Sequence, residues 1–557
     1  MSDQATAAAG AAPARAGALS HRQILTILSG LMLGMLLAAL DQTIMGSAMK
    51  TIADQLHGQT LQAWATTAYL ITATISTPLY GKLSDIFGRK PMYLTAISVF
   101  LAGSLLSGIA SSMYELAAFR AVQGLGAGGL MSLALAIIAD ITSPRERSRY
   151  TGYFMGVWGL SSVAGPLIGG LFAGLDTFAG ITGWRWVFLL NVPIALLAMV
   201  VVTKFLNVPH NKVTQRIDFW GAGALVLGLV PLLIVAEQGR EWGWGSGASI
   251  AMYVIGAVGL VAFVVVEKLM GDAALLPMRL FRRPVFSMVN VINFIMGIGM
   301  FGMMMSLPLY LQIVKGATPT ESGLMSLPMM FGIMVSAMSS GRITSRTGRY
   351  RVFPIVGLGA TAAALFLFAQ ITTTTPLPLT MSIMFLAGIG LGLCMQSLLL
   401  AIQADVPAKD MGVATSSATF FRSIGGTVGT AVFLSILFGV VGDRIAAAFA
   451  SARTDPAFIA AMQNPANAGA VKSIQGGAGL DLNDTTFLAH MDPALSRPIL
   501  DGFASSLDTV FTVGGIVLLV AFALIWFVKE VPLSNKSGIQ RAAAEEDKDA
   551  VPAVAMH

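Results

Sequence analysis

The chain has 557 residues, of which 55% are apolar and only 11% are charged, whereas a water-soluble domain carries about 25% charged residues. Its mean hydropathy is +0.75, so the composition excludes an ordinary soluble protein and predicts an integral membrane protein. The net charge of +6 agrees with the excess of Lys and Arg in cytoplasmic loops of membrane proteins, so we expect no nucleic-acid partner.

The sequence also excludes several kinds of chemistry. It lacks the GxxxxGK[ST] pattern of a P-loop, so we expect neither ATP-driven transport nor a soluble catalytic domain. Its single cysteine, Cys394, cannot form an internal disulfide, and its five histidines are scattered without the spacing of metal ligands. We therefore predict a protein that is not an enzyme and has no metal or cofactor.

Fourteen apolar stretches are long enough for transmembrane helices, each of which needs about 20 residues. We predict helices near residues 24–47, 62–83, 91–110, 113–137, 150–174, 185–205, 217–237, 248–268, 285–311, 320–341, 352–371, 378–402, 412–440 and 507–529. Because this number is even, both termini lie on one side of the membrane. Most of the 34 Lys and Arg residues fall in tails and loops on that side, which the positive-inside rule assigns to the cytoplasm.

An internal repeat divides the chain. Three residues of one loop and three glycines of a later helix recur 260 residues further on: Gly81, Gly88, Arg89, Gly152, Gly165 and Gly169 match Gly341, Gly348, Arg349, Gly412, Gly425 and Gly429. Transporters are often built from such duplicated halves. The spacing leaves room for two additional helices, so we predict an all-α polytopic membrane protein with a 6 + 2 + 6 plan.

The plan sets the expected boundaries. We expect a cytoplasmic tail at residues 1–23, a six-helix bundle at 24–205, two additional helices at 217–268, a second six-helix bundle at 285–529 and a cytoplasmic tail at 530–557. The polar segment 441–506, which contains four prolines, lies outside and is either disordered or a small amphipathic cap. We expect helices 217–268 to lie against lipid and not to line the substrate route, because the repeat gives them no counterpart.

A charged residue inside a membrane helix costs about 2.5–3.5 kcal/mol on insertion scales, so it is a functional candidate. Asp41 lies deep in the first helix and Arg120 reaches a similar depth in the fourth, with Gln42 and Gln123 beside them. These residues are candidates for proton coupling and for the substrate cavity. The alternative is a salt bridge that only locks the helices together.

The loop GKLSDIFGRK is the candidate gate. Asp85 and Arg89 are four residues apart, which places them on one face of a helix, and Asp140 offers Arg89 a second partner. Asp85 could also cap the positive end of a helix near Gly412. The alternative is that these are only positive-inside charges.

The fifth helix contains Gly165, Pro166 and Gly169, where small residues allow close packing and proline bends the helix. We predict that this packing rearranges during gating; the alternative is packing that never moves.

The ninth helix is rich in methionine, whose side chain adapts to varied apolar shapes. Further cavity candidates lie there and in helix thirteen: Asn290, Asn293, Met300, Met304, Gln312 and Arg422. The methionines could instead face lipid or the core, and Arg422 could bind an anionic group or backbone carbonyls.

Together these motifs resemble the major facilitator superfamily, in particular its fourteen-helix drug:proton antiporters. LDQTIMGSAMKTIADQL resembles the first-helix motif, here with Asp41, although Gly46, Met49 and Lys50 depart from the usual residues. GKLSDIFGRK resembles the superfamily loop motif, FRAVQGLGAGG the fourth-helix motif with a proton-linked arginine, here Arg120, and VAGPLIGG the antiporter motif of helix five. WRWVFLLNVP is similar to a further signature of the group. The resemblance covers about residues 20–530.

The resemblance implies alternating access in the cell (inner) membrane by a protein that we expect to be monomeric. Proton binding at Asp41 would drive export of bulky amphipathic or cationic compounds, and each proton supplies about 2.3 kcal/mol per 100 mV. The predicted helix 320–341 lacks the additional acid of some dication exporters, with Glu321 only at its outer edge. The alternative functions are an exporter of an endogenous lipid, siderophore or antibiotic and, in a different class, a non-transporting sensor.

Overall fold

The computed structural model describes residues 21–56, 62–207, 218–407, 410–464, 467 and 491–533. The N-terminal half contains α1 (His21–Gln55), α2 (Gln62–Phe87), α3 (Arg89–Ile109), α4 (Met113–Ile141), α5 (Pro144–Ala173) and α7 (Asn191–Phe205). Between α5 and α7 lie an antiparallel hairpin, β1 (Thr177–Phe178) and β2 (Ile181–Thr182), and the short helices η2 (Gly183–Arg185) and α6 (Trp186–Leu189).

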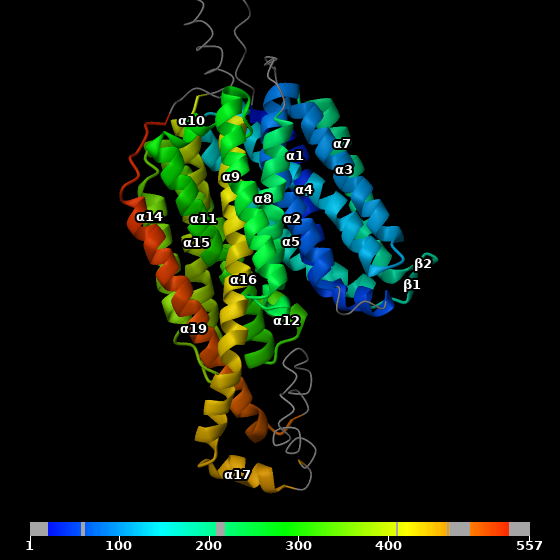
Figure 1. Ribbon diagram of the computed structural model, residues 1–557, viewed down its shortest axis with the longest axis vertical. Helices are drawn as coiled ribbons and strands as arrows, with labels where there is room; N and C mark the ends of the chain where they lie inside the picture. The colour runs from blue at the N-terminus through cyan, green and yellow to red at the C-terminus, as the bar shows by residue number, and fades with distance from the viewer. Residues whose placement is uncertain are drawn as a thin grey trace, which may run out of the picture.

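The C-terminal half contains α11 (Pro284–Leu309), η4 (Tyr310–Val314), α12 (Pro319–Met325), α13 (Leu327–Thr347), α14 (Val352–Phe368), α15 (Leu377–Asp405), α16 (Met411–Ala452), α17 (Pro456–Gln463) and α19 (Pro493–Ile525). The halves are joined by α8 (Phe219–Trp242), α9 (Gly247–Met270), η3 (Gly271–Ala273) and α10 (Met278–Phe281). We name the two ends of the bundle the α10 end and the α17 end after the helices that lie there (Figure 1).

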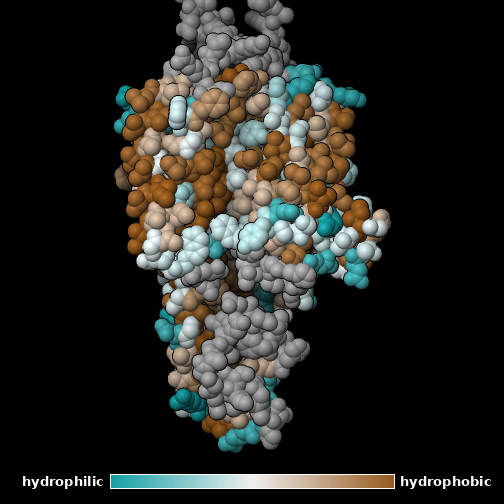
Figure 2. All heavy atoms as spheres, turned by 45° about the vertical axis from the view of Figure 1, so that its right-hand side comes forward, coloured by the Kyte–Doolittle hydropathy of each residue, from teal (hydrophilic) through white to brown (hydrophobic). Residues whose placement is uncertain are grey.

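The predicted fold class is confirmed. Within the described ranges, twelve helical segments are long and apolar enough to cross a bilayer. The total of fourteen also requires α2, which is not among those twelve, and α14, which is apolar but shorter. Figure 2 shows apolar side chains over the middle of the bundle, with hydrophilic ones gathered near its ends.

Helix packing repeats between the halves. In the first half α1 packs on α5 and α7, and α4 on α2 and α3; in the second, α11 packs on α16 and α19, and α15 on α13 and α14. The contacts between halves are also paired, since α5 packs on α13 and α2 on α16. The repeat in sequence therefore corresponds to a repeat in packing, and the halves meet along two helix pairs.

Several predicted boundaries were wrong. The predicted loop 441–506 is helical at both ends, because α16 continues to Ala452 and α19 begins at Pro493, and α17 lies between them. Asp492 caps α19 and accepts hydrogen bonds from Asn467 Nδ2 and Ala494 N, both at 2.9 Å, which lower the pKa of its carboxyl group. The sequence predicted a loop at 441–506 because this segment as a whole is more polar than the transmembrane stretches. The helices α16 and α19 extend into it beyond their apolar spans. Residues 465–466 and 468–490 lie outside the described residues.

Two further helices differ from expectation. The predicted helix 320–341 is divided at Ser326 into α12 and α13, and the first helix continues to Gln55. This extension is stabilised by burial, since Ile44, Ile52 and Ala53 pack in one cluster with Trp184. Of the predicted tails, residues 1–20 and 534–557 lie outside the described residues.

The additional helices α8 and α9 lie along the seam between the halves (Figure 1), where α8 packs on both α2 and α16. The outer face of α9 is apolar and exposed: Val254, Val258, Val261 and Val265 are each at least 50% exposed. An exposed apolar face of this kind is suited to contact with lipid, and the peripheral role of these helices stays a prediction. The contact of α8 with both halves was not expected.

Candidate functional site

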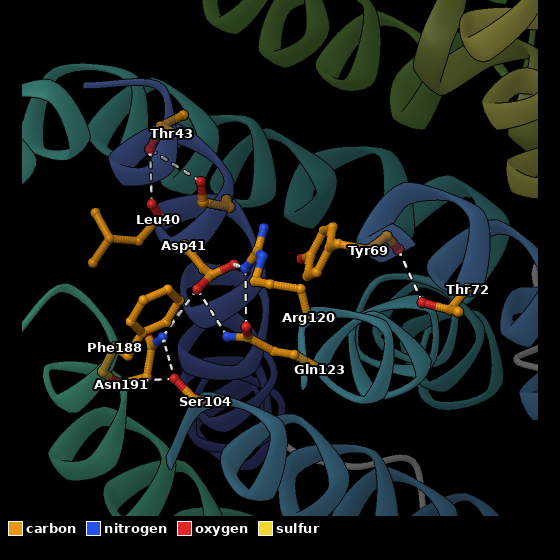
Figure 3. A network of polar contacts seen from close by, with 11 residues as sticks. Leu40, Asp41, Thr43, Tyr69, Thr72, Ser104, Arg120, Gln123, Phe188 and Asn191 are labelled. Carbon is orange, nitrogen blue, oxygen red and sulfur yellow. Dashed lines mark hydrogen bonds and ion pairs between the residues drawn. The ribbon is translucent and has the colours of Figure 1, made fainter. Parts of the chain in front are cut away.

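A buried polar network joins residues from six elements of the N-terminal half around Asp41 (Figure 3). Arg120 on α4 forms an ion pair with Asp41 Oδ2, and its Nη1 also donates to Gln123 Oε1 at 2.9 Å. Gln123 Nε2 donates to Asp41 Oδ1 at 2.8 Å, and Asn191 Nδ2, at the start of α7, donates to the same oxygen at 3.2 Å. Both oxygens of the carboxylate therefore have donors from other helices.

A second layer orients these donors. Asn191 Nδ2 also donates to Ser104 Oγ on α3 at 2.9 Å, and that hydroxyl donates to the Phe188 carbonyl at 2.9 Å. The Tyr69 ring on α2 lies 4.1 Å from Arg120 Cζ, a cation–π distance. The guanidinium group is therefore held between an aromatic face and a carboxylate.

Close helix packing creates this arrangement. Gly103 on α3 lies against the backbone of Gln123, and a Cβ atom at Gly103 would overlap it. The absent side chain lets α3 approach α4, which places Ser104 and Gln123 around one carboxylate. Asp41 is 0% exposed and Arg120 is 1% exposed, so neither group reaches solvent without a change in helix packing.

The structure thus brings together Asp41, Arg120 and Gln123, three of the four polar residues singled out in helices one and four. Gln42 is half-buried, and its side chain is not part of the network drawn in Figure 3. Sequence reasoning missed Tyr69, Ser104 and Asn191. Asn191 lies within the quoted segment WRWVFLLNVP, where one amide among apolar residues was the available signal.

At the α10 end, the candidate gate residues lie where four helices meet. Arg89 bridges Asp85 on α2 and Asp140 on α4, with N–O distances of 2.6 Å for each pair, and it also donates to Ser84. Asp85 and Arg89 lie against Gly412 at the start of α16, so closely that a Cβ atom there would overlap both side chains. The network is therefore shared between the two halves.

Helix α5 uses Gly165 and Pro166 in different contacts. Gly165 lies against Thr43 of α1, whose hydroxyl donates to the Ser161 carbonyl at 2.9 Å. Pro166 faces Gly323 of α12 in the other half, where a Cβ atom would lie 3.7 Å from the ring. Gly169 is buried within α5.

The C-terminal candidates are more dispersed. Asn290 and Asn293 are 1% exposed; Asn290 Nδ2 donates to the Phe286 carbonyl at 3.0 Å, whereas Asn293 Nδ2 has no partner among the described residues. Met300 packs in the core, and Met304 and Gln312 are half-buried. Arg422 is half-buried where α16 approaches Gly297 of α11, and no ion pair or hydrogen bond of its side chain occurs within the described ranges.

An apolar groove of about 560 Å³ lies between the halves. It is lined by Gly156, Gly159 and Leu160 of α5, by α13 from Leu327 to Met334, and by Phe385 of α15. Leu160 and Phe331 are more than half exposed, so the groove is open and its exposed lining is apolar. In the part of the chain described, no three His, Cys, Asp or Glu side chains are grouped as a metal site requires.

Comparison with known proteins agrees with this architecture. Residues 31–430 match the family model described as the Major Facilitator Superfamily. The chain is 31% identical over 544 residues to the multidrug transporter protein MdtP of Bacillus subtilis, covering 96% of this chain and 98% of that protein. It is 40% identical over 338 residues to a tetracycline resistance determinant of Streptomyces rimosus, covering 60% of this chain and 95% of that protein.

Among solved structures, the human organic anion transporter MFSD10 (TETRAN) has the same fold, with a TM-score of 0.59, 14% identity and coverage of 90% of this chain and 99% of that one. The multi-pass helical fold, the paired halves and the match over most of the sequence lead to one conclusion. The chain belongs to the major facilitator superfamily of membrane transporters.

Proposed function

We propose that this transporter is a proton-coupled antiporter that exports bulky amphipathic or cationic compounds from the cytoplasm, with the α10 end on the cytoplasmic side of the inner membrane. The names of the multidrug transporter and tetracycline resistance relatives support drug efflux. The observation that carries proton coupling is the buried Asp41 carboxylate with its charged partner Arg120. A buried acid–base pair of this kind is typical of proton relays in transporters.

The proposed coupling follows from charge. When Asp41 is ionised, its charge is compensated by Arg120 and by the amides of Gln123 and Asn191. A proton on Asp41 removes the negative charge and leaves Arg120 buried beside a neutral acid, which is costly. The transporter relieves this cost by repacking α1 and α4, and the repacking changes which side of the membrane the site faces.

The contacts between halves support alternating access. Arg89, Asp85 and Gly412 join the halves at the α10 end, so the described conformation is closed there. Opening to the cytoplasm separates α2 from α16 and leaves Asp85 without the helix terminus that it faces. Rocking of two similar halves about a central site is the general mechanism of duplicated transporters.

The apolar groove between α5 and α13 supports amphipathic substrates. Such compounds concentrate in the bilayer because burial of apolar surface is favourable. A groove that opens on the lipid-facing side allows them to reach the region between the halves without first entering water.

The test is transport by reconstituted Asp41→Asn protein. The amide keeps the shape of the side chain but cannot carry the coupled proton, so we expect the variant to fold and to lose uphill efflux driven by a pH gradient. Glu115→Gln is the matched control, because Glu115 is exposed in the first turn of α4, outside the Asp41 network, and bonds only locally to Ser111 and Ser112. Wild-type uphill transport by Asp41→Asn protein would exclude Asp41 as the coupling acid.

A further inference from the structure

Two buried carboxyl groups meet in the additional helices, away from the Asp41 network. Asp218 precedes α8 and Glu267 lies in the last turn of α9, and both residues are 0% exposed. Asp218 Oδ1 accepts a hydrogen bond from Gly221 N at 2.6 Å, and Glu267 Oε2 accepts one from Leu276 N at 2.9 Å. One oxygen of each group is therefore fixed by backbone.

The other oxygen of each group borders one small space beside Gly221. Asp218 Oδ2 and Glu267 Oε1 are both buried without a hydrogen-bond partner among the described residues. A Cβ atom built on Gly221 would lie within 3 Å of each of these oxygens, so both reach the same small space. Gly221 leaves that space free.

Among the described residues, the positive charges around the pair do not compensate it fully. From α2, Lys82 is 3% exposed and interacts electrostatically with Glu267, but also with Asp85 and Asp410. Arg279 of α10 forms a bidentate ion pair with Asp410, with N–O distances of 2.8 and 2.6 Å. Lys82 is therefore one cation shared among several carboxylates, while Asp218 and Glu267 would be two adjacent anions.

Two ionised carboxylates cannot remain in contact in a buried site, because their repulsion is large where the dielectric constant is low. A single proton removes the repulsion, because it neutralises one of the two charges. The same proton supplies a hydrogen bond between the two oxygens that otherwise lack a partner among the described residues. We propose that Asp218 and Glu267 share one proton, forming a proton-binding carboxyl pair in the additional helices that is separate from Asp41.

The pair connects the start of α8, the end of α9 and the segment leading to α10. Glu267 accepts from the backbone of the segment leading to α10, Asp218 holds the first turn of α8, and α8 in turn packs on α2 and α16. Loss of the shared proton would leave adjacent anions and loosen the start of α8 from the end of α9. The α8–α9 hairpin therefore responds to pH near the gate.

The test compares Asp218→Asn and Glu267→Gln with the wild-type protein in detergent. In either variant the new amide donates to the remaining carboxylate as the shared proton does, so both should fold. We expect the apparent Tm of the wild type to fall by on the order of 2 °C or more between about pH 6 and about pH 8.5, because the folded state holds the extra proton. Each variant should lose that pH dependence, and Glu115→Gln should retain it.

Infrared spectroscopy gives a second readout that needs no variant to be stable. The wild type at about pH 6 should show the carbonyl stretch of a protonated carboxyl group that is absent at about pH 8.5. The proposal would be overturned if Tm had the same pH dependence in the wild type and in both variants. It would also be overturned if Glu267→Gln lost the same stability at both pH values, since Glu267 would then be the partner of Lys82. Stabilisation of the wild type by Na⁺ or Ca²⁺ in place of protons would overturn it as well.

Discussion

At the scale of single residues, the N-terminal network shows why an acid and an arginine persist inside apolar helices. Asp41 receives donors from α4 and α7, and Arg120 is flanked by Asp41, Gln123 and Tyr69. Buried charges are tolerated when they are paired and hydrogen-bonded. Loss of either charge would leave the other buried alone, which is the reason that we propose this pair as the coupling site.

In Arg120→Ala protein, we therefore expect that proton binding at Asp41 no longer drives the proposed repacking of α1 and α4. Without the guanidinium group, protonation of Asp41 no longer leaves an uncompensated cation, so the driving force for repacking is lost. We expect pH-gradient-driven efflux in proteoliposomes to fall at least tenfold, with a loss of about 1.4 kcal/mol or more in transition-state stabilisation. Efflux with unchanged pH dependence would assign Arg120 a purely structural role.

At the scale of helices, α2 and α16 meet through residues that lack bulk. Gly81 lies against Ser416, and Gly412 lies against Asp85 and Arg89, so added Cβ atoms would overlap their neighbours. Small residues allow such close helix contacts in membranes. The closed α10 end depends on two helix backbones approaching at these positions.

Gly412→Ala should prevent that approach. The new methyl group overlaps Asp85 and Arg89, so the α10 end closes less completely and turnover falls, by about 10²-fold if the misplacement approaches 1 Å. Substrate affinity, measured by equilibrium binding, should change by less than about tenfold. Gly439→Ala on the same helix is the control, because nothing lies within 4 Å of its added Cβ atom. Equal turnover in the two variants would contradict the assignment of this contact to the gate.

At the scale of the whole molecule, the proposed alternating access requires the halves to separate at the α10 end, where α2 and α16 are in contact. The positions of Gly81 and Ser416 allow a test, since a Cβ atom on Gly81 would lie 2.7 Å from Ser416 Cβ. A disulfide has a Cβ–Cβ separation of about 3.8 Å, so the two helices must move apart by about 1 Å for the bond to form. Cys394, the single native cysteine, is buried on α15.

A protein carrying both Gly81→Cys and Ser416→Cys should form a disulfide on oxidation and stop transporting. Reduction should restore transport to the level of the Gly81→Cys single variant, whose added side chain by itself hinders closure, because the bond adds only the restraint that keeps α2 from leaving α16. Transport by the two single variants in proteoliposomes should be insensitive to the oxidant. Full transport by the cross-linked protein, verified by its shifted mobility on a gel, would show that the α10 end need not open.

The sequence by itself determined the membrane class and the duplicated halves, and it placed Asp41 and Arg120 at a similar depth in their helices. These features follow from apolar stretch length, from residues repeated at a fixed offset and from the cost of charges in lipid, all of which are properties of local sequence. The order of motifs along the chain added the family.

Only the tertiary structure decided which residues complete each site. Asn191 and Tyr69 join Asp41 and Arg120 because α7 and α2 pack beside them. Asp218 and Glu267 lie near each other because α9 returns along α8. The helical ends of segment 441–506 were missed because helices beyond the apolar span have polar composition. Contacts between distant segments depend on helix packing, which no local pattern specifies.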